Sequence, residues 1–284
     1  MYFVHNLDPV VWHIWGPMAI RWYGLAYIGG LIAGYFLLDR WGRAGRYPLQ
    51  GEQLQSLLMS LVIGILVGGR LGEFLFYDMK SFLANPLVFF RLWEGGMSSH
   101  GGMIGCVVAV WIASRKLKVP ILRLGDGLCA VAPIGIGFGR LANFINGELW
   151  GRPTSVSWAV IFPQEAGLDP TAPGIRDIIP AYLERGLVYP RHPSQLYEAA
   201  LEGVLLGLIL LWVYRSKWAA EKPGFVSGLF FALYAAFRVA VEYFREPDRL
   251  YWGWLSQGQL LSVVVLLPIA AVLFWLSARA QKNR

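Results

Sequence analysis

The stretch FVSGLFFALYAAFRVAVEYF, residues 225–244, has the length and composition of a membrane-spanning helix. The hydrocarbon core of a bilayer is about 30 Å thick, and an α-helix crosses it with about 20 mostly apolar residues. The charged residues of this stretch are Arg238 and Glu242. Because a charged side chain within a bilayer is costly, its presence indicates a specific role.

Similar apolar blocks recur along the 284 residues, which are 56% hydrophobic and only 15% charged. Soluble domains contain about 25% charged residues, so a soluble enzyme, a disordered protein and a disulfide scaffold are excluded. The sequence predicts an all-α polytopic membrane protein that forms a single integral membrane domain over residues 1–284. The seven spans that we expect are about 18–38, 55–76, 98–114, 121–140, 194–214, 225–244 and 257–277.

Basic residues predict the orientation of these spans. The second, fourth and sixth linkers contain eight basic residues, Arg245 among them, spread over a much greater length than the basic residues of the other linkers and the tail. The positive-inside rule therefore places the N-terminus outside and the C-terminus in the cytoplasm. The basic residues on the cytoplasmic side account for much of the net charge of +7, so we expect no nucleic-acid partner. The first, third and fifth linkers and the tail contain Arg40, Arg43, Arg46, Arg115, Lys116, Lys118, Arg123, Arg215, Lys217, Lys222, Arg279, Lys282 and Arg284.

The polar segment at about 141–193, rich in Pro and Gly, predicts an external insertion, such as a small arm or lid, rather than a second core. With this orientation, the polar residues of the spans gather in the outer leaflet. Arg70 and Glu73, at i and i+3, favour a structural ion pair. Residues at i, i+4 and i+8 of the sixth span share one helix face, for which we favour a functional role. The residues at this outer level are Tyr23, Arg70, Glu73, His100, Arg140, Tyr234, Arg238 and Glu242.

Three motifs border this level. GRLANFINGELWG (139–151) combines Arg140 with amides and an acid, and a guanidinium with neutral amide donors suits a phosphate group. WEGGMSSHGG (93–102) surrounds His100 with glycines, which let a ligand approach the backbone closely. HPSQLYE (192–198) starts the fifth span, and Glu198 there is equally consistent with scaffold and site.

These groups suit a reaction on a membrane phosphate. If a nucleophile attacks a lipid carbon and expels a phosphate ester, charge grows on the phosphate, and two arginines stabilise that transition state. Histidine is the residue type most often used as a general base near neutral pH, which makes His100 the candidate. The four His residues have no metal-ligand spacing and no Walker-type loop is present, so we expect neither a metal nor a cofactor.

The motif GRLANFINGELWG strongly resembles the signature of bacterial prolipoprotein diacylglyceryl transferases. WEGGMSSHGG, the Trp22–Gly24 start of the first span, HPSQLYE and the face of the sixth span resemble other marked segments of that family, so the likeness covers nearly the whole chain. It implies transfer of the diacylglyceryl group from phosphatidylglycerol to the lipobox cysteine of a prolipoprotein signal peptide. The products are a thioether and glycerol 1-phosphate, and the reaction begins lipoprotein maturation at the bacterial cytoplasmic (inner) membrane.

The resemblance also implies roles for single residues. Arg140 binds the phosphatidylglycerol headgroup, and His100 is the candidate base or orients the substrate. Tyr23 is an essential neighbour of the site. The other residues shape the site or form its facing wall: Asn143, Glu148, Gly151, Tyr234, Arg238 and Glu242.

The alternative from another class is a transporter or flippase for an anionic lipid. Transporters typically show internal repeats and broken helices at the midplane, and the sequence shows neither.

Overall fold

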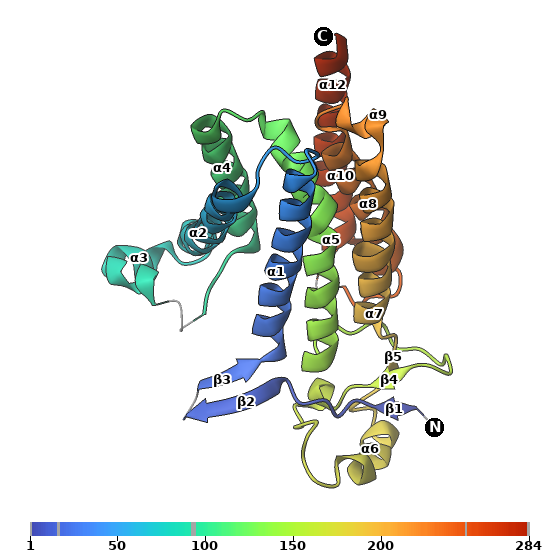
Figure 1. Ribbon diagram of the computed structural model, residues 1–284. Helices are drawn as coiled ribbons and strands as arrows, with labels where there is room; N and C mark the ends of the chain where they lie inside the picture. Colours follow the sequence, from blue (N-terminus) through green and yellow to red (C-terminus); the bar gives the residue numbers. More distant parts are fainter. Residues whose placement is uncertain (1, 16–17, 92–94, 248, 283–284) are drawn as a thin grey trace. The chain divides into compact units, whose positions relative to one another are not determined.

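The computed structural model describes residues 2–15, 18–91, 95–247 and 249–282 (Figure 1). The chain forms two compact units, one comprising Met1–Gly34 with Cys129–Arg284 and the other Tyr35–Leu128. The division falls within two long helices, α1 (Trp22–Arg43) and α5 (Ile121–Asn146).

The first unit is a bundle of long helices, with α10 packed beside α8 and α12 (Figure 1). Two of its helices contain π-helical turns, which are labelled η4 and η5. After α5, its helices are α6 (Ile175–Glu184), α7 (Ser194–Glu198), η4 (Ala199–Leu205), α8 (Leu206–Arg215), α9 (Lys217–Ala220), α10 (Phe225–Glu242), α11 (Gln257–Leu261), η5 (Ser262–Leu266) and α12 (Leu267–Lys282), with a 3-10 turn, η3 (Pro163–Ala166).

Close backbone contacts hold the long helices together. A Cβ atom added at Gly203 of η4 would lie 2.6 Å from the Cα of Gly137 on α5. On the other side of α5, a Cβ at Gly30 of α1 would lie 2.8 Å from the Cα of Gly135. Such contacts are typical of membrane helices, which associate by packing small residues and gain little from hydrophobic burial.

The second unit consists of α2 (Gly51–Phe76), α3 (Met79–Ala84), the 3-10 turn η1 (Pro86–Phe90) and α4 (Ser99–Leu117). The helices α2 and α4 also pack through glycines, because a Cβ at Gly68 would lie 2.4 Å from the carbonyl oxygen of Gly101. The Ser98 side chain caps α4 by accepting a hydrogen bond from the Gly101 amide.

Within the described residues, five helical segments are long and apolar enough to cross a membrane. They coincide with five of the expected spans, so the prediction of a polytopic helical membrane protein is confirmed at this level. Helices α1 and α4 lie where the other two were expected. Helix α5 continues to Asn146, past the expected end at residue 140, and therefore carries part of the signature motif. The five segments are Gly51–Leu75, Ile121–Asn146, Ser194–Arg215, Phe225–Glu242 and Gln257–Ala280.

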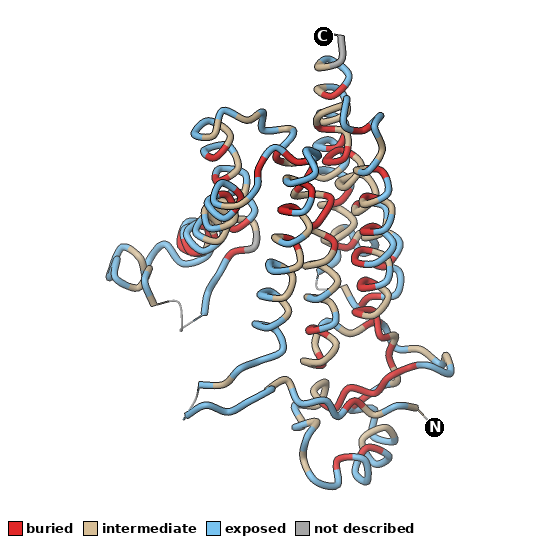
Figure 2. The backbone as a smooth tube through the Cα atoms, in the orientation of Figure 1, coloured by how far each residue is buried: buried red, intermediate tan, exposed pale blue. Residues whose placement is uncertain are grey.

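Short strands, which the all-α prediction omitted, accompany the helices. A three-stranded sheet has the order β1-β4-β5, with β1 parallel and β5 antiparallel to β4. At this sheet, Ile161, Ile179 of α6 and Val188 form a small buried core, against which Tyr2 and Val4 of the N-terminal segment also pack (Figure 2). The strands are β1 (Phe3–Val4), β2 (Val10–Trp15), β3 (Met18–Arg21), β4 (Val160–Ile161), β5 (Pro190–Arg191), β6 (Leu250–Tyr251) and β7 (Leu255–Ser256); β2–β3 and β6–β7 are hairpins.

Candidate active site

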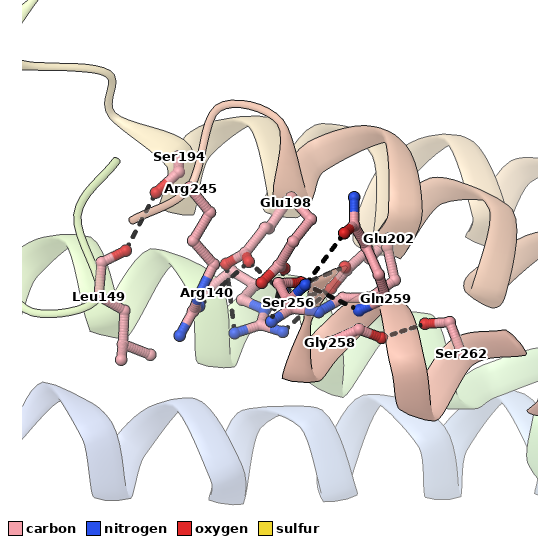
Figure 3. Close-up of polar contacts among 12 residues, drawn as sticks. Arg140, Leu149, Ser194, Glu198, Glu202, Arg245, Ser256, Gly258, Gln259 and Ser262 are labelled. Atoms are coloured by element: carbon pink, nitrogen blue, oxygen red, sulfur yellow. Dashed lines mark hydrogen bonds and ion pairs between the residues drawn. The ribbon is translucent and has the colours of Figure 1, made fainter. Parts of the chain in front are cut away.

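Six charged side chains from three helical segments of the first unit meet in one place. We call them the arginine–glutamate cluster. Figure 3 shows that Arg140, Glu198, Glu202 and Arg245 of this cluster point toward one another. The full cluster comprises Arg140 of α5, Glu198 of α7, Glu202 of η4, Arg238 and Glu242 of α10, and Arg245 just after α10.

Arg140 pairs with two glutamates at once. Its Nη1 lies 3.2 Å from Oε2 of Glu198, and its Nη2 and Nε lie 3.1 and 3.3 Å from Oε2 of Glu202. Both glutamate side chains are fully buried, whereas that of Arg140 remains 17% exposed. The guanidinium thus closes the accessible side of two buried carboxylates.

Arg238 and Arg245 complete the cluster. Nη1 of Arg238 donates to Glu198 and lies 3.8 Å from Glu202, and its Nη2 lies 3.3 Å from Glu242. Nη1 of Arg245 lies 3.3 Å from Glu198, which therefore contacts three arginines. Three positive and three negative charges balance, as the high cost of an unpaired buried charge requires. Tyr234, one turn before Arg238, interacts electrostatically with the cluster.

The backbone explains why two glutamates of one segment converge. Glu198 and Glu202 are four residues apart, a spacing that places side chains on one helix face. They flank the start of η4, and π-helical turns are rare and frequently lie at functional sites. This irregular turn therefore marks the part of the segment that contributes both carboxylates.

The signature motif turns back on itself beside the cluster. Asn143 and Asn146 donate their side-chain amides to Oε1 of Glu148, over 2.7 and 3.2 Å. The Glu148 carbonyl accepts a hydrogen bond from the side chain of Gln195, and the Leu149 carbonyl accepts one from Ser194 (Figure 3). The motif HPSQLYE thus anchors the turn of the signature motif.

Gly151 ends this turn in a place where no side chain fits. A Cβ atom there would lie 2.4 Å from the carbonyl oxygen of Phe244 and 2.6 Å from that of His192. The Gly151 carbonyl accepts a hydrogen bond from Arg191, which also pairs with Glu165. Burial lowers the pKa of the Arg191 guanidinium, but its acidic partners outweigh that effect and raise the pKa above its usual value.

Two further predicted site residues, Tyr23 and His100, lie on helices that contribute no residue to the arginine–glutamate cluster. Tyr23 is in the first turn of α1, and its hydroxyl accepts a hydrogen bond of 3.0 Å from Tyr27. His100 lies in the first turn of α4 and is half-buried. Because His100 belongs to the second unit, its approach to the cluster stays a prediction. Trp93 and Glu94 of its motif lie outside the described residues.

Arg70, also in the second unit, differs from expectation. Its guanidinium donates to the backbone carbonyl oxygens of Val88, Phe89, Arg91, Gly95 and Gly96, and these hydrogen bonds, rather than the expected ion pair with Glu73, account for its burial.

Sequence reasoning missed Glu202 and assigned Arg245 to an external linker. A signal for Glu202 was present, because an acidic residue inside an apolar span requires a partner just as a basic one does. For Arg245 no such signal existed, since it follows the apolar stretch directly and resembles an ordinary flanking charge.

Comparison with known proteins finds relatives that match nearly the whole chain. A relative from Rhizobium meliloti (strain 1021) is 45% identical over 97% of this chain and 93% of its own length. Another, from Pseudoalteromonas atlantica, is 45% identical over 95% of this chain and 89% of its own length. Both are named phosphatidylglycerol–prolipoprotein diacylglyceryl transferase. A family model described as prolipoprotein diacylglyceryl transferase matches residues 9–276, and the chain therefore belongs to that family.

Proposed function

We propose that this chain transfers the diacylglyceryl group of phosphatidylglycerol to the lipobox cysteine of a prolipoprotein signal peptide. The observation that carries the proposal is the arginine–glutamate cluster, in which Arg140 and Arg238 keep 17% and 14% of their side chains exposed. Buried arginines that stay partly accessible within an apolar helical unit suit the phosphate of a membrane lipid. The names of the relatives state the same two substrates for those proteins.

The site belongs in the outer leaflet of the bacterial cytoplasmic membrane. This placement rests on seven spans, with α1 and α4 added to the five apolar segments, and on the basic linkers that put the N-terminus outside. The segment at about 141–193, which contains β4, β5 and α6, is then an external insertion within one integral membrane domain of residues 1–284.

The phosphate binds to donors that the carboxylates leave free. A guanidinium has five N–H groups, and the hydrogen bonds of Arg140 to Glu202 use one on Nε and one on Nη2. Its Nη1 lies 3.2 Å from Glu198 as an ion pair. The remaining N–H groups on Nη1 and Nη2 supply the planar fork that matches two phosphate oxygens. Arg238 faces the same carboxylates and supplies the second positive charge.

In the reaction, the sulfur of the lipobox cysteine attacks the glyceryl carbon that carries the phosphate. A carbon–sulfur bond forms, the carbon–oxygen bond to phosphate breaks, and the bonding electrons leave with glycerol 1-phosphate. The leaving phosphate gains negative charge toward two, so the arginines bind the transition state more strongly than the ground state. His100 accepts the thiol proton; a free thiol has a pKa near 8.5, so a modest base is sufficient.

The other predicted residues position this machinery. Asn143, Asn146 and Glu148 fix the turn after α5, and Gly151 lets that turn lie against the chain after α10. Tyr234 and Glu242 form the wall of α10 beside Arg238. Tyr23 contacts the substrate from α1.

A transfer assay with purified protein tests the proposal. Phosphatidylglycerol labelled in its acyl chains is mixed with a lipobox peptide, and a peptide with Ser in place of the cysteine is the control. We expect label on the cysteine peptide alone, and release of glycerol phosphate in equal amount. If neither peptide acquires label while labelled lipid moves between the leaflets of a vesicle, the proposed transferase activity is wrong and the protein is instead a flippase.

A further inference from the structure

The guanidinium of Arg70 is surrounded by backbone carbonyl groups. Arg70 lies on α2, is only 4% exposed, and stacks over the ring of Phe74 at 5.1 Å. Its Nε donates one hydrogen bond, and Nη1 and Nη2 donate two each. Four of these five hydrogen bonds are 2.7–3.1 Å long. The acceptors are the carbonyl oxygens of Val88, Phe89, Arg91, Gly95 and Gly96.

Five hydrogen bonds use every N–H group that an arginine has. No donor of Arg70 is left for a phosphate, in contrast to Arg140. All five acceptors belong to the residues that lead into α4, on both sides of residues 92–94. Arg70 therefore fixes the course of the chain before α4.

This segment before α4 (residues 88–91 and 95–98) ends at the helix that carries His100. The Ser98 amide donates to the Gly69 carbonyl over 2.9 Å, next to Arg70, and the Ser98 side chain caps the helix. Gly95 and Gly96 have φ angles of +79° and +73°, a left-handed conformation that turns both carbonyl groups toward Nη1. His100 follows Ser98 by two residues, so its position depends on these contacts.

From this geometry we propose that Arg70 is a positioning residue for His100. It holds the segment before α4 through the backbone, and thereby sets where the imidazole stands when it accepts the thiol proton. The inference rests on the proposed role of His100. It assigns Arg70 no contact with either substrate.

The substitution Arg70→Lys tests this inference. Lysine keeps the positive charge but has three donors on one nitrogen, which do not span five carbonyl groups. We expect kcat to fall about 100-fold, the order of loss that a displacement of about 1 Å produces. The KM for phosphatidylglycerol stays unchanged, because the phosphate ligands are elsewhere. Arg43→Lys is the matched control, since Arg43 is 71% exposed and pairs with Asp39.

A pair of glycine variants tests the same contact without changing Arg70. A Cβ at Gly95 or at Gly45 meets no atom within 4 Å, and both residues have a similar left-handed φ, +79° and +70°. Alanine at either position therefore imposes a similar backbone strain. Only Gly95→Ala moves a carbonyl that Arg70 binds, so we expect it to lower kcat at least tenfold more than Gly45→Ala.

Four results overturn the inference. The first is a wild-type kcat in Arg70→Lys, and the second is a raised KM for phosphatidylglycerol with kcat kept, which would make Arg70 a lipid ligand. The third is an equal loss in Gly95→Ala and Gly45→Ala. If Arg70→Lys does not fold, this glycine pair decides alone. The fourth is full activity of His100→Gln, which also overturns the proposed base; the other three leave that role intact.

Discussion

Two regions of this protein bury arginine in opposite ways. In the arginine–glutamate cluster, Arg140 and Arg238 are held by carboxylates on neighbouring helices, and each stays partly exposed. In the second unit, Arg70 is held by carbonyl groups of one backbone segment and is almost fully buried. An arginine with free donors beside it can receive an anion, whereas one with every donor engaged serves as scaffold. The partners of a buried arginine therefore indicate its role better than its depth does.

The two arrangements also differ in what a lost partner does. Breaking a buried ion pair strands the remaining charge, which costs about 3–5 kcal/mol. Losing one carbonyl contact of Arg70 leaves four others in place. The cluster is thus sensitive to the replacement of any one of its arginines or glutamates.

The largest effect is expected from Arg140→Lys. The charge remains, so the glutamates keep a partner, but the fork of donors for phosphate is lost. We expect kcat/KM for transfer to fall about 10²–10³-fold, as for the loss of one preorganised donor. Steady-state assays beside Arg185→Lys, an exposed arginine of the same unit, provide the comparison. Near-normal turnover would remove the distinction between the cluster and Arg70.

The substitution Glu198→Gln is expected to lower stability most. Glu198 contacts three arginines, and the neutral glutamine side chain in its place would leave these arginines in excess over the remaining carboxylates. We expect a loss of about 3–5 kcal/mol, measured by thermal unfolding in detergent. Glu202→Gln loses less, because Glu202 contacts two arginines. Exposed Glu184→Gln is the control, and equal losses at positions 198 and 202 would argue against Glu198 as the centre.

A smaller loss is expected from Gly151→Ala, which leaves every charge in place. Its methyl group would overlap the carbonyl oxygens of Phe244 and His192, so the chain must shift at both. Overpacking of this kind costs about 1–3 kcal/mol. Activity should fall together with the unfolding temperature, because the turn supports Glu148. Gly167→Ala is the control, since a Cβ there meets nothing within 4 Å, although its φ of +70° adds strain. An unchanged unfolding temperature would show that the turn adapts freely.

The two regions also show what a sequence reveals. Arg140 and Arg238 were predicted to share one site because each is a charge in an apolar span, and the structure brings them to the same glutamates. Arg70 was marked by the same signal, but its partners are carbonyl groups, which every residue has and no pattern identifies. Strands β1, β4 and β5 are two residues long, and β1 pairs with β4 across more than 150 positions, so they leave no periodicity to detect.

His5 shows a third way in which this protein buries a basic side chain, and its substitution is expected to have the smallest effect. His5 is fully buried, with Nε2 2.8 Å from the Phe144 carbonyl and Nδ1 3.1 Å from the amide nitrogen of Gln164. Because that amide donates, Nδ1 accepts and the imidazole is neutral. Burial lowers the pKa of His5 from its usual value of 6.5, so the stability that it contributes is present above pH 6.5 and is lost as the pH falls through the lowered pKa.

We therefore expect the unfolding temperature of the wild type to fall by a few degrees more between pH 7.5 and pH 5 than that of His5→Gln. The exposed His13 provides the matched variant, His13→Gln, which should follow the wild type. If His5→Gln keeps the full acid dependence, the imidazole is not held neutral. The end of α5 would then be supported by a charge, as the cluster is. A flattened profile instead shows that the protein neutralises a buried base where no carboxylate is at hand, and keeps its ion pairs for the arginines that must remain charged.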